Sequence, residues 1–241
     1  MIEVIDLEKH FGDNEVLKGI NVTVDKGDIM VVIGPSGSGK STFLRCLNCM
    51  EDPTGGQIIF NGVDIADMKV DINVHRRHMG MVFQHFNLFP HLSVLENVTE
   101  AMIHVLKKSK EKAEKEGIKI LTRMGLEAKI NQYPCNLSGG EQQRASIART
   151  LAINPKIIFM DEPTSALDPE LVGEVLKVVK QLASEKRTMV IVTHEISFAR
   201  EIADRVIFMS NGEIIEQGKP EEVIDNPTKE RTKEFLKRYL K

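Results

Sequence analysis

Apolar runs separated by polar and glycine-rich stretches recur along this chain, and their spacing predicts its elements. Four runs are almost entirely apolar, at 29–33, 79–83, 157–160 and 189–193. A run without polar alternation is typical of a strand buried on both faces, as in a parallel sheet. Helical patterns lie between these strands, and this alternation predicts a parallel sheet with right-handed crossovers.

Other segments predict antiparallel pairs beside that sheet. Residues 2–4 and 20–24 alternate apolar and polar positions, and Gly12-Asp13-Asn14 between them is a turn signal. The run 57–60 reads as a further strand that ends in a tight turn. Near the C-terminus, Asn211-Gly212 separates two apolar runs, which predicts a hairpin with a type I′ turn.

The pattern becomes helical from Ser93, which opens a capping box ahead of apolar positions at three- and four-residue steps. A charged stretch then leads into a second helix that ends near Gly125, where glycine suits the C-cap. A third helix follows from Ser138. This long stretch without strands indicates a helical subdomain inserted at 91–155 into an α/β core.

Composition and charge narrow the class of protein. The chain has 241 residues, 28% of them charged, and a net charge of −3, which argues against a general nucleic-acid binder. No apolar run approaches the roughly 18 to 20 residues that span a bilayer, and the N-terminus lacks the pattern of a signal peptide. We therefore expect a cytoplasmic protein that contacts a membrane only through a partner.

The three cysteines are an odd number, which fits a reducing compartment. Cys46 and Cys49 fall where a helix is expected, and we expect both thiols to be half-buried. A metal site needs more ligands nearby, and a redox pair precedes a helix instead of lying within one. The spacing therefore favours small core residues.

The first candidate for chemistry follows the apolar run 29–33. The sequence there fits G-x-x-x-x-G-K-S, with Gly34, Gly39, Lys40 and Ser41 in register. Glycines let successive backbone N–H groups turn toward one anion, and a helix beginning near Gly39 adds the positive end of its dipole. Lysine supplies a charge for the β- and γ-phosphates, and the serine hydroxyl suits Mg²⁺. The segment is therefore a predicted phosphate-binding loop (P-loop).

Further polar residues stand at the ends of the other predicted strands. Asp161 and Glu162 follow 157–160, Gln84 follows 79–83 and His194 follows 189–193. The carboxyl ends of parallel strands are where open α/β sheets bind ligands. Phe11 precedes the first turn, and its position fits a core residue and a ring stacked on adenine equally well.

Taken in order, these motifs resemble the ATP-binding-cassette (ABC) ATPases over essentially the whole chain. The family-specific motif is Leu137-Ser138-Gly139-Gly140-Glu141, with Ser165-Ala166-Leu167-Asp168 after the acids. Glu141 stands where the family more often has glutamine. The resemblance implies a single ABC ATPase domain over 1–241: a P-loop nucleotide-hydrolase core with a mixed parallel sheet and an N-terminal antiparallel β subdomain at 1–90 and 156–241, and the helical subdomain at 91–155.

The resemblance also implies roles for single residues. Phe11 would stack on the adenine of ATP with Val16 beside it, and the phosphates would lie in the loop formed by Gly34, Pro35, Ser36, Gly37, Ser38, Gly39, Lys40, Ser41 and Thr42. Mg²⁺ would be approached by Ser41, Gln84 and Asp161. Glu162 would polarise the attacking water, and His194 would touch the γ-phosphate and hold Glu162 in line. Phosphoryl transfer needs positioning and charge neutralisation, which this set can supply.

The family works as a head-to-tail dimer, in which Ser138, Gly139, Gly140 and Glu141 of one chain complete the ATP site of the other. This chain has one motif series, so the resemblance implies a homodimer. Ser138 and Glu141 also fit a plain capping box, and both interpretations can hold together because a capped helix start is an anion site.

The leading functional hypothesis is the energy-coupling subunit of a membrane importer at the cytoplasmic face of the membrane. The segment Gln84–Phe89 carries an apolar cluster, which fits docking of two transmembrane permease subunits, with Phe86 and Leu88 in the docking groove, or packing between core and helical subdomain. Within importers the motifs resemble the polar amino acid uptake group (glutamine, arginine or histidine), which implies an extracytoplasmic solute-binding protein. The alternatives are a transporter ATPase for another solute and a soluble ABC ATPase; no nucleic-acid partner is expected.

Overall fold

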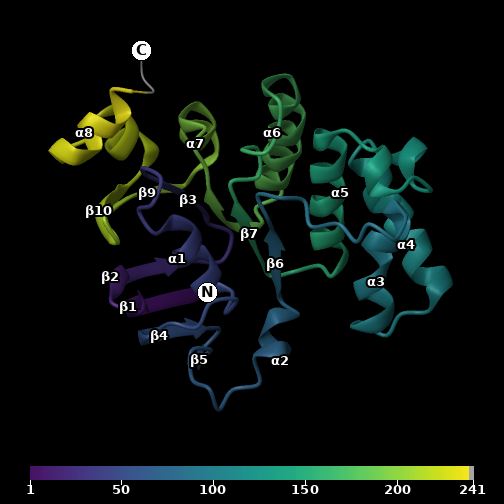
Figure 1. Ribbon diagram of the computed structural model, residues 1–241, viewed down its shortest axis with the longest axis horizontal. Coiled ribbons are helices and arrows are strands. Elements are labelled where there is room, and N and C mark those ends of the chain that lie inside the picture. The colour runs from purple at the N-terminus through teal and green to yellow at the C-terminus, as the bar shows by residue number, and fades with distance from the viewer. Residues whose placement is uncertain (239–241) are drawn as a thin grey trace.

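The computed structural model describes residues 1–238 and has two β-sheets with helices around them (Figure 1). The central sheet has the order β10-β9-β3-β8-β7-β6. All its neighbours are parallel except β9 and β10, which form the predicted hairpin. Its strands are β3 (Ile29–Ile33), β6 (Met79–Val82), β7 (Ile157–Asp161), β8 (Thr188–Val192), β9 (Arg205–Ser210) and β10 (Glu213–Gly218).

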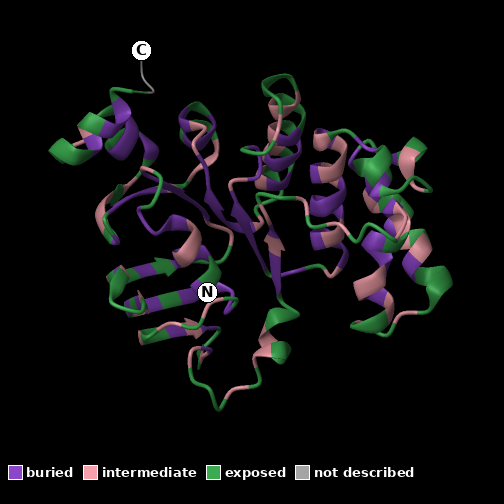
Figure 2. Cartoon of the chain, in the orientation of Figure 1, coloured by how far each residue is buried: buried purple, intermediate pink, exposed green. Residues whose placement is uncertain are grey.

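Burial on both faces explains the unbroken apolar runs. In β3, Ile29, Val31 and Ile33 belong to one hydrophobic core, and Met30 and Val32 belong to the core on the other side of the sheet. Figure 2 shows the central strands buried between the helices. A strand in this position has no solvent-facing side on which polar residues are favoured.

The second sheet is antiparallel, as the N-terminal alternation predicts, and has the order β2-β1-β4-β5. It packs with helix α1 on one face of the central sheet, in a core that includes Leu7, Leu17, Phe43 and Leu44. The elements are β1 (Ile2–Phe11), β2 (Asn14–Val24), β4 (Gly55–Phe60), β5 (Val63–Asp64), α1 (Lys40–Leu47) and the short α2 (Ile72–Arg76).

Between β6 and β7 the described structure has helices, single turns and loops. α3 (Val94–His104) begins with the predicted capping box at Ser93, α4 (Lys110–Arg123) is followed by Gly125 in a left-handed conformation, and α5 (Gly139–Ala152) begins at Ser138. α3 packs against α4 and α5, which lie on the right in Figure 1. The division into a core at 1–90 and 156–241 and a helical subdomain at 91–155 stays a prediction.

The remaining helices are α6 (Pro169–Ser184), α7 (Ile196–Ile202) and α8 (Glu230–Leu236). The β9–β10 turn has φ of 53° at Asn211 and of 84° at Gly212. Both turn residues are therefore left-handed, as a type I′ turn requires. Among residues 1–238, no helix is both long enough and apolar enough to cross a membrane.

Candidate nucleotide-binding site

The loop between β3 and α1 is packed so closely that two of its glycines cannot carry a side chain. Gly34 has φ of +151°, and a Cβ there would overlap the carbonyl oxygen of Met209. Gly39 has φ of +96°, and a Cβ would lie 2.9 Å from the carbonyl oxygen of Val16. β2 and the β9–β10 hairpin thus hold the curled loop from two sides, with Val16 beside it.

Positive charge is concentrated where this loop meets α1. Lys40 is buried, and its Nζ donates to the carbonyl oxygens of Gly34 (3.0 Å) and Pro35 (2.9 Å). Burial lowers the pKa of Lys40, against the opposing effect of the nearby carboxylates of Glu162 and Asp161. The N-cap of α1 is Gly39, which offers no side chain to the first N–H groups of the helix. An anion is the natural partner of such a helix start beside a buried ammonium.

Ser41 and Asp161 meet across the end of β7. The Ser41 hydroxyl donates to Oδ1 of Asp161 at 2.7 Å, and Arg45 lies 3.6 Å from the other carboxylate oxygen. Burial raises the pKa of Asp161, although the Ser41 hydrogen bond and Arg45 oppose that effect. A buried carboxylate next to a hydroxyl fits a hard cation such as Mg²⁺.

Glu162 and His194 come together from neighbouring strands. Oε1 of Glu162 lies 2.8 Å from Nε2 of His194, and this hydrogen bond is the largest cause of a lowered pKa for Glu162. Glu162 has φ of 45°, and its N–H donates to Val192 of β8 at 2.9 Å. This left-handed turn directs Glu162 and Asp161 to different partners, an uncommon conformation that is often kept at functional sites.

Gln84 and Phe11 are both solvent-exposed in the structure. Gln84 follows β6, which pairs with β7, so it lies at the same edge of the sheet as Asp161. Phe11 ends β1 and is 49% exposed, which excludes the core alternative for its ring. The structure therefore leaves the stacking alternative for Phe11 in place.

Ser138 and Glu141 form the capping box at the start of α5. The Ser138 N–H donates to the Glu141 carboxylate at 2.8 Å, and Lys129 pairs with that carboxylate at 3.2 Å. The carboxylate is therefore compensated locally. α5 packs on α3, α4, α6 and β6, whereas α1 packs on β7, β8 and β2, so Ser138, Gly139 and Gly140 belong to a different packing unit from the P-loop.

Sequence reasoning missed several polar contacts at the site. Arg45 lies one helical turn after Ser41, and this i, i+4 spacing was the available signal for its approach to Asp161. Three side chains of α5 hold the segment that contains Gln84: Gln143 donates to Phe83 O, Thr150 to Met81 O and Arg149 to Asn87 O. No local sequence pattern predicts these three hydrogen bonds from α5.

The cysteines lie outside this chemistry. Cys46 and Cys49 are buried, more completely than the predicted half-burial, and burial raises their pKa to about 12 and about 11. Both are therefore unreactive thiols in the core, as the spacing favours, while Cys135 is exposed.

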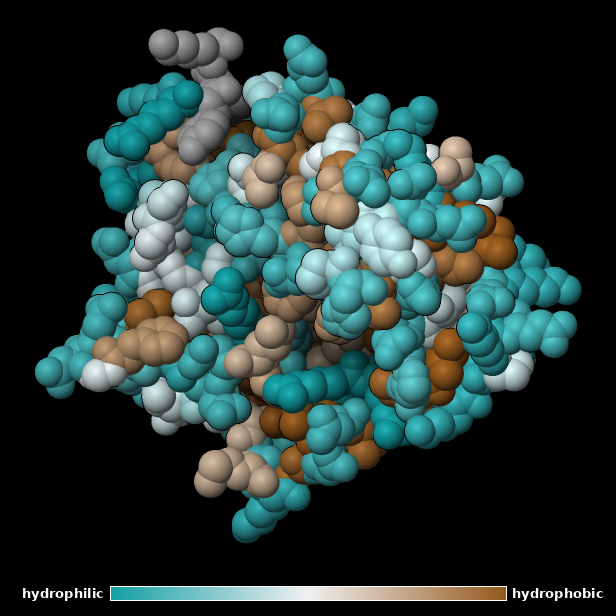
Figure 3. Space-filling model, turned by 45° about the vertical axis from the view of Figure 1, so that its right-hand side comes forward, coloured by the Kyte–Doolittle hydropathy of each residue, from teal (hydrophilic) through white to brown (hydrophobic). Residues whose placement is uncertain are grey.

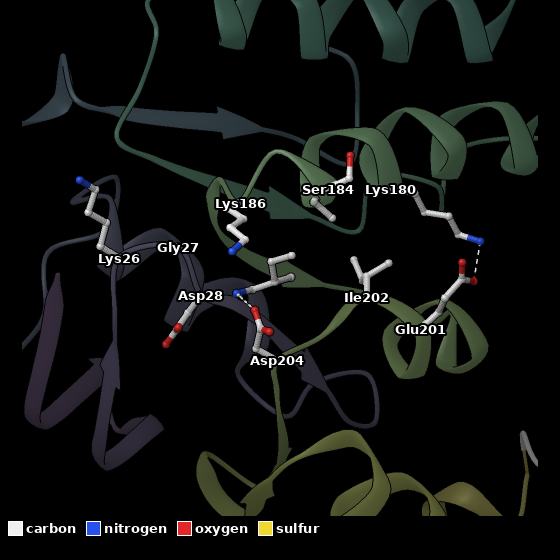
Figure 4. Close-up of a pocket in the computed structure, with 11 residues that line it drawn as sticks. Lys26, Gly27, Asp28, Lys180, Ser184, Lys186, Glu201, Ile202 and Asp204 are labelled. Atoms are coloured by element: carbon white, nitrogen blue, oxygen red, sulfur yellow. Dashed lines mark hydrogen bonds and ion pairs between the residues drawn. The ribbon is translucent and has the colours of Figure 1, made fainter.

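A separate cavity of about 630 Å³ lies at the opposite edge of the central sheet, where β3, β8 and β9 begin (Figure 4). Lys180 and Glu201 form an ion pair at 2.5 Å there, and Asp204 accepts the N–H of Ile29. These two contacts lie at the amino ends of the strands, away from the P-loop.

Comparison with known proteins agrees with this geometry. Residues 17–165, which include the P-loop, Ser138–Glu141 and both acids, match the ABC transporter family. The glutamine transport ATP-binding protein GlnQ of Geobacillus stearothermophilus is 53% identical over 100% of this chain and 99% of its own length. The L-cystine import ATP-binding protein TcyC of Bacillus subtilis (strain 168) is also 53% identical, with the same coverage.

Among solved structures, a dimer of the ATP-binding cassette MJ0796 in a post-hydrolysis state with bound ADP and Pi has a TM-score of 0.82 and 36% identity. The alignment covers 91% of this chain and 99% of that one. Because the full-length likeness coincides with a P-loop, paired acids and a histidine at one edge of the sheet, this chain belongs to the ABC transporter family, as one of its ATPase domains.

Proposed function

We propose that this chain is the ATP-hydrolysing subunit of a membrane importer of polar amino acids. The observation that carries the proposal is the convergence at one sheet edge of Lys40, the Ser41–Asp161 pair and the Glu162–His194 pair. A buried cation, a buried carboxylate with a hydroxyl, and a second carboxylate held by an imidazole are what phosphoryl transfer to water needs.

Each group has a distinct task in that reaction. The loop N–H groups and Lys40 bind the phosphates and neutralise charge that develops on them. Glu162 orients and polarises the attacking water, and His194 holds Glu162 in place through the 2.8 Å contact. Ser41, Asp161 and Gln84 would hold Mg²⁺, which when bound neutralises phosphate charge.

Two copies of the chain act together in this proposal. Ser138, Gly139 and Gly140 lie at the start of α5, which packs away from α1, so they do not belong to the P-loop unit of their own copy. In the proposed dimer these three residues face the nucleotide bound to the other copy. ATP binding closes this head-to-tail dimer and hydrolysis reopens it. A related cassette is a dimer with bound ADP and Pi, which supports the pairing of two copies around the nucleotide.

Two permease subunits in the membrane are the partners that the dimer would drive from the cytoplasmic face. A hollow of about 390 Å³ lies beside α5, and its lining includes Met79, Phe83, Asn87, Phe89 and Arg149. Phe89 is 44% exposed there. Figure 3 shows hydrophobic patches that interrupt the mostly hydrophilic surface on this side of the molecule. An apolar hollow of this kind supports docking of a partner segment.

The structure changes which residues of the cluster we assign to docking. Phe86 and Leu88 were expected to form the groove, but both are half-buried, and Leu88 packs against the hydrophobic core. Phe89 and Asn87 line the hollow in their place. The packing alternative therefore applies to Leu88, and the docking alternative is carried by Phe89.

Movement of a docked partner would reach Ser138 through α5. Arg149 donates to Asn87 O at 2.6 Å and Thr150 to Met81 O at 2.9 Å, so the Gln84 segment and α5 are joined at several points. A shift of one therefore shifts the other, and α5 carries Ser138 at its start.

The solute class rests on the motifs and on the relatives, whose names specify glutamine and cystine at equal identity. An extracytoplasmic solute-binding protein would deliver the amino acid to the permeases. The test is uptake of labelled glutamine, arginine, histidine and cystine by cells lacking this chain and complemented with the parent or with Lys40→Ala. We expect Lys40→Ala to abolish uptake of one solute or a small group of them. Lys26→Ala, which removes an exposed lysine away from the P-loop, is the matched control; parental uptake by Lys40→Ala cells would refute the proposal.

A further inference from the structure

Lys9 on β1 is a buried lysine that the proposed reaction does not use. It is 7% exposed, and its Nζ lies 2.7 Å from Oε1 of Glu51 and donates to the carbonyl oxygen of Asp52 at 2.7 Å. The same Nζ stands 4.7 Å from the centre of the Phe11 ring. Burying an ammonium is unfavourable unless it is paired, and here a carboxylate, a carbonyl and a ring face share the charge.

The contact with Phe11 follows from the strand. Residues two positions apart on a strand project from the same face, so Lys9 and Phe11 are neighbours on β1. Phe11 is still 49% exposed, so the ammonium and its surroundings cover only part of the ring. The ring is thus held from one side and open on another.

Further bonds connect this strand end to the helix of the P-loop. The Glu51 and Met50 N–H groups both donate to the carbonyl oxygen of Arg45 in α1. The Thr54 N–H donates to Glu8 O of β1, and Thr54 Oγ1 accepts the N–H of His10. Lys9 therefore ties the end of β1, where Phe11 lies, to the segment that leaves α1.

We propose that Lys9 is a positioning residue that holds the Phe11 ring in place for the adenine base of ATP. This rests on the proposed function, in which Phe11 stacks on adenine. The ammonium fixes one ring face through a cation–π contact, and the bond network sets the distance from the ring to the phosphate site. A ring already ordered before the nucleotide arrives loses less conformational freedom on binding. The affinity therefore rises for ligands that carry a base and not for those without one.

The chain contains no tryptophan, so Phe11→Trp places a single indole at the stacking position. We would titrate this variant with a non-hydrolysable ATP analogue and with tripolyphosphate, which has no base, with and without Lys9→Met. Indole emission reports on stacking, and calorimetry reports on binding of either ligand. Lys18→Met, which removes an exposed lysine of the neighbouring strand, is the matched control.

We expect Lys9→Met to weaken analogue binding by about three- to tenfold, from the size of cation–π and ordering effects, and to leave tripolyphosphate binding unchanged. Lys9→Arg, which keeps a cation, should restore most of the affinity. If Lys9→Met does not fold, Glu51→Gln carries the same expectation because it releases the ammonium from its ion pair. Equal weakening of both ligands, or no change for the analogue, overturns the role of Lys9.

The experiment also distinguishes failure of the Lys9 proposal from failure of the assignment of Phe11 to adenine stacking. If the analogue binds by calorimetry but the indole emission does not respond, Phe11 does not stack on the base, and both assignments fall. If the emission responds while Lys9→Met binds the analogue like the parent, the stacking assignment stands and only the role of Lys9 is refuted.

Discussion

Replacing Glu162 with glutamine removes one negative charge from the site while keeping the shape of the side chain. An amide can still bond to Nε2 of His194, which lies 2.8 Å from the carboxylate, so the local geometry should persist. The change also leaves one carboxylate fewer facing the phosphates. We therefore expect ATP binding to hold or tighten and the chemical step to slow.

The size of the effect follows from the state of the carboxyl. The hydrogen bond from His194 lowers the pKa of Glu162, so the group is ionised at neutral pH and is a weak proton acceptor. Its contribution is then mainly the orientation and polarisation of water, for which loss of one well-placed group costs about 10² to 10³ in rate, or about 2.7–4 kcal/mol. The expected loss therefore lies in the lower part of the range for general bases.

The assay combines steady-state ATPase rates with gel filtration in the presence and absence of MgATP. Bound, uncleaved ATP bridges two copies, so Glu162→Gln should elute as a dimer only with MgATP. Asp161→Asn should instead lose metal-dependent turnover, and Glu111→Gln, an exposed acid on α4, serves as the charge control. A Glu162→Gln protein with the parental rate, or one that stays monomeric at saturating MgATP, would refute the reasoning.

Three further experiments test other features of the structure. Lys129→Met leaves the Glu141 carboxylate without its 3.2 Å partner, so ATPase activity should fall, and Glu141→Gln in the same chain should restore it. Equal rates in the parent, the single variant and the double variant would contradict this coupling. Gly34→Ala forces a Cβ into the carbonyl oxygen of Met209 and should lower the free energy of unfolding by about 1–3 kcal/mol. Thermal unfolding measures this loss, and an unchanged melting temperature would contradict the close packing of the loop. A thiol reagent at pH 8 should label the native chain once, at Cys135, because the other two thiols are buried; rapid labelling of all three would refute their burial.

Local patterns predicted the elements well where burial has a simple periodic form. The runs at 29–33 and 157–160 became β3 and β7 with at most one residue of difference, because a strand covered on both faces accepts apolar residues at every position. The capping boxes at Ser93 and Ser138 were also readable, since both partners of each box lie three residues apart in the chain.

The apolar cluster after Gln84 shows what local sequence patterns do not predict, namely which of its residues pack into the core. Apolar character alone did not separate Leu88, which packs into the core, from Phe89, which lines the hollow. The same limit applied to Phe11, whose exposure decided between two interpretations that its position left equal. Which side of a loop meets the core depends on the elements packed against it, and those are distant in sequence.

By itself, the sequence determined the P-loop, the order of strands and helices and the family resemblance, because each depends on residue types at short, regular spacing. Only the tertiary structure decided that Lys129 compensates Glu141, that Arg149 holds the segment after β6, and that Lys9 pairs with Glu51. These contacts join segments whose spacing along the chain has no period. They exist because packing of the two sheets and of α5 brings the segments within a few ångströms, a result of the whole fold that no single stretch of sequence encodes.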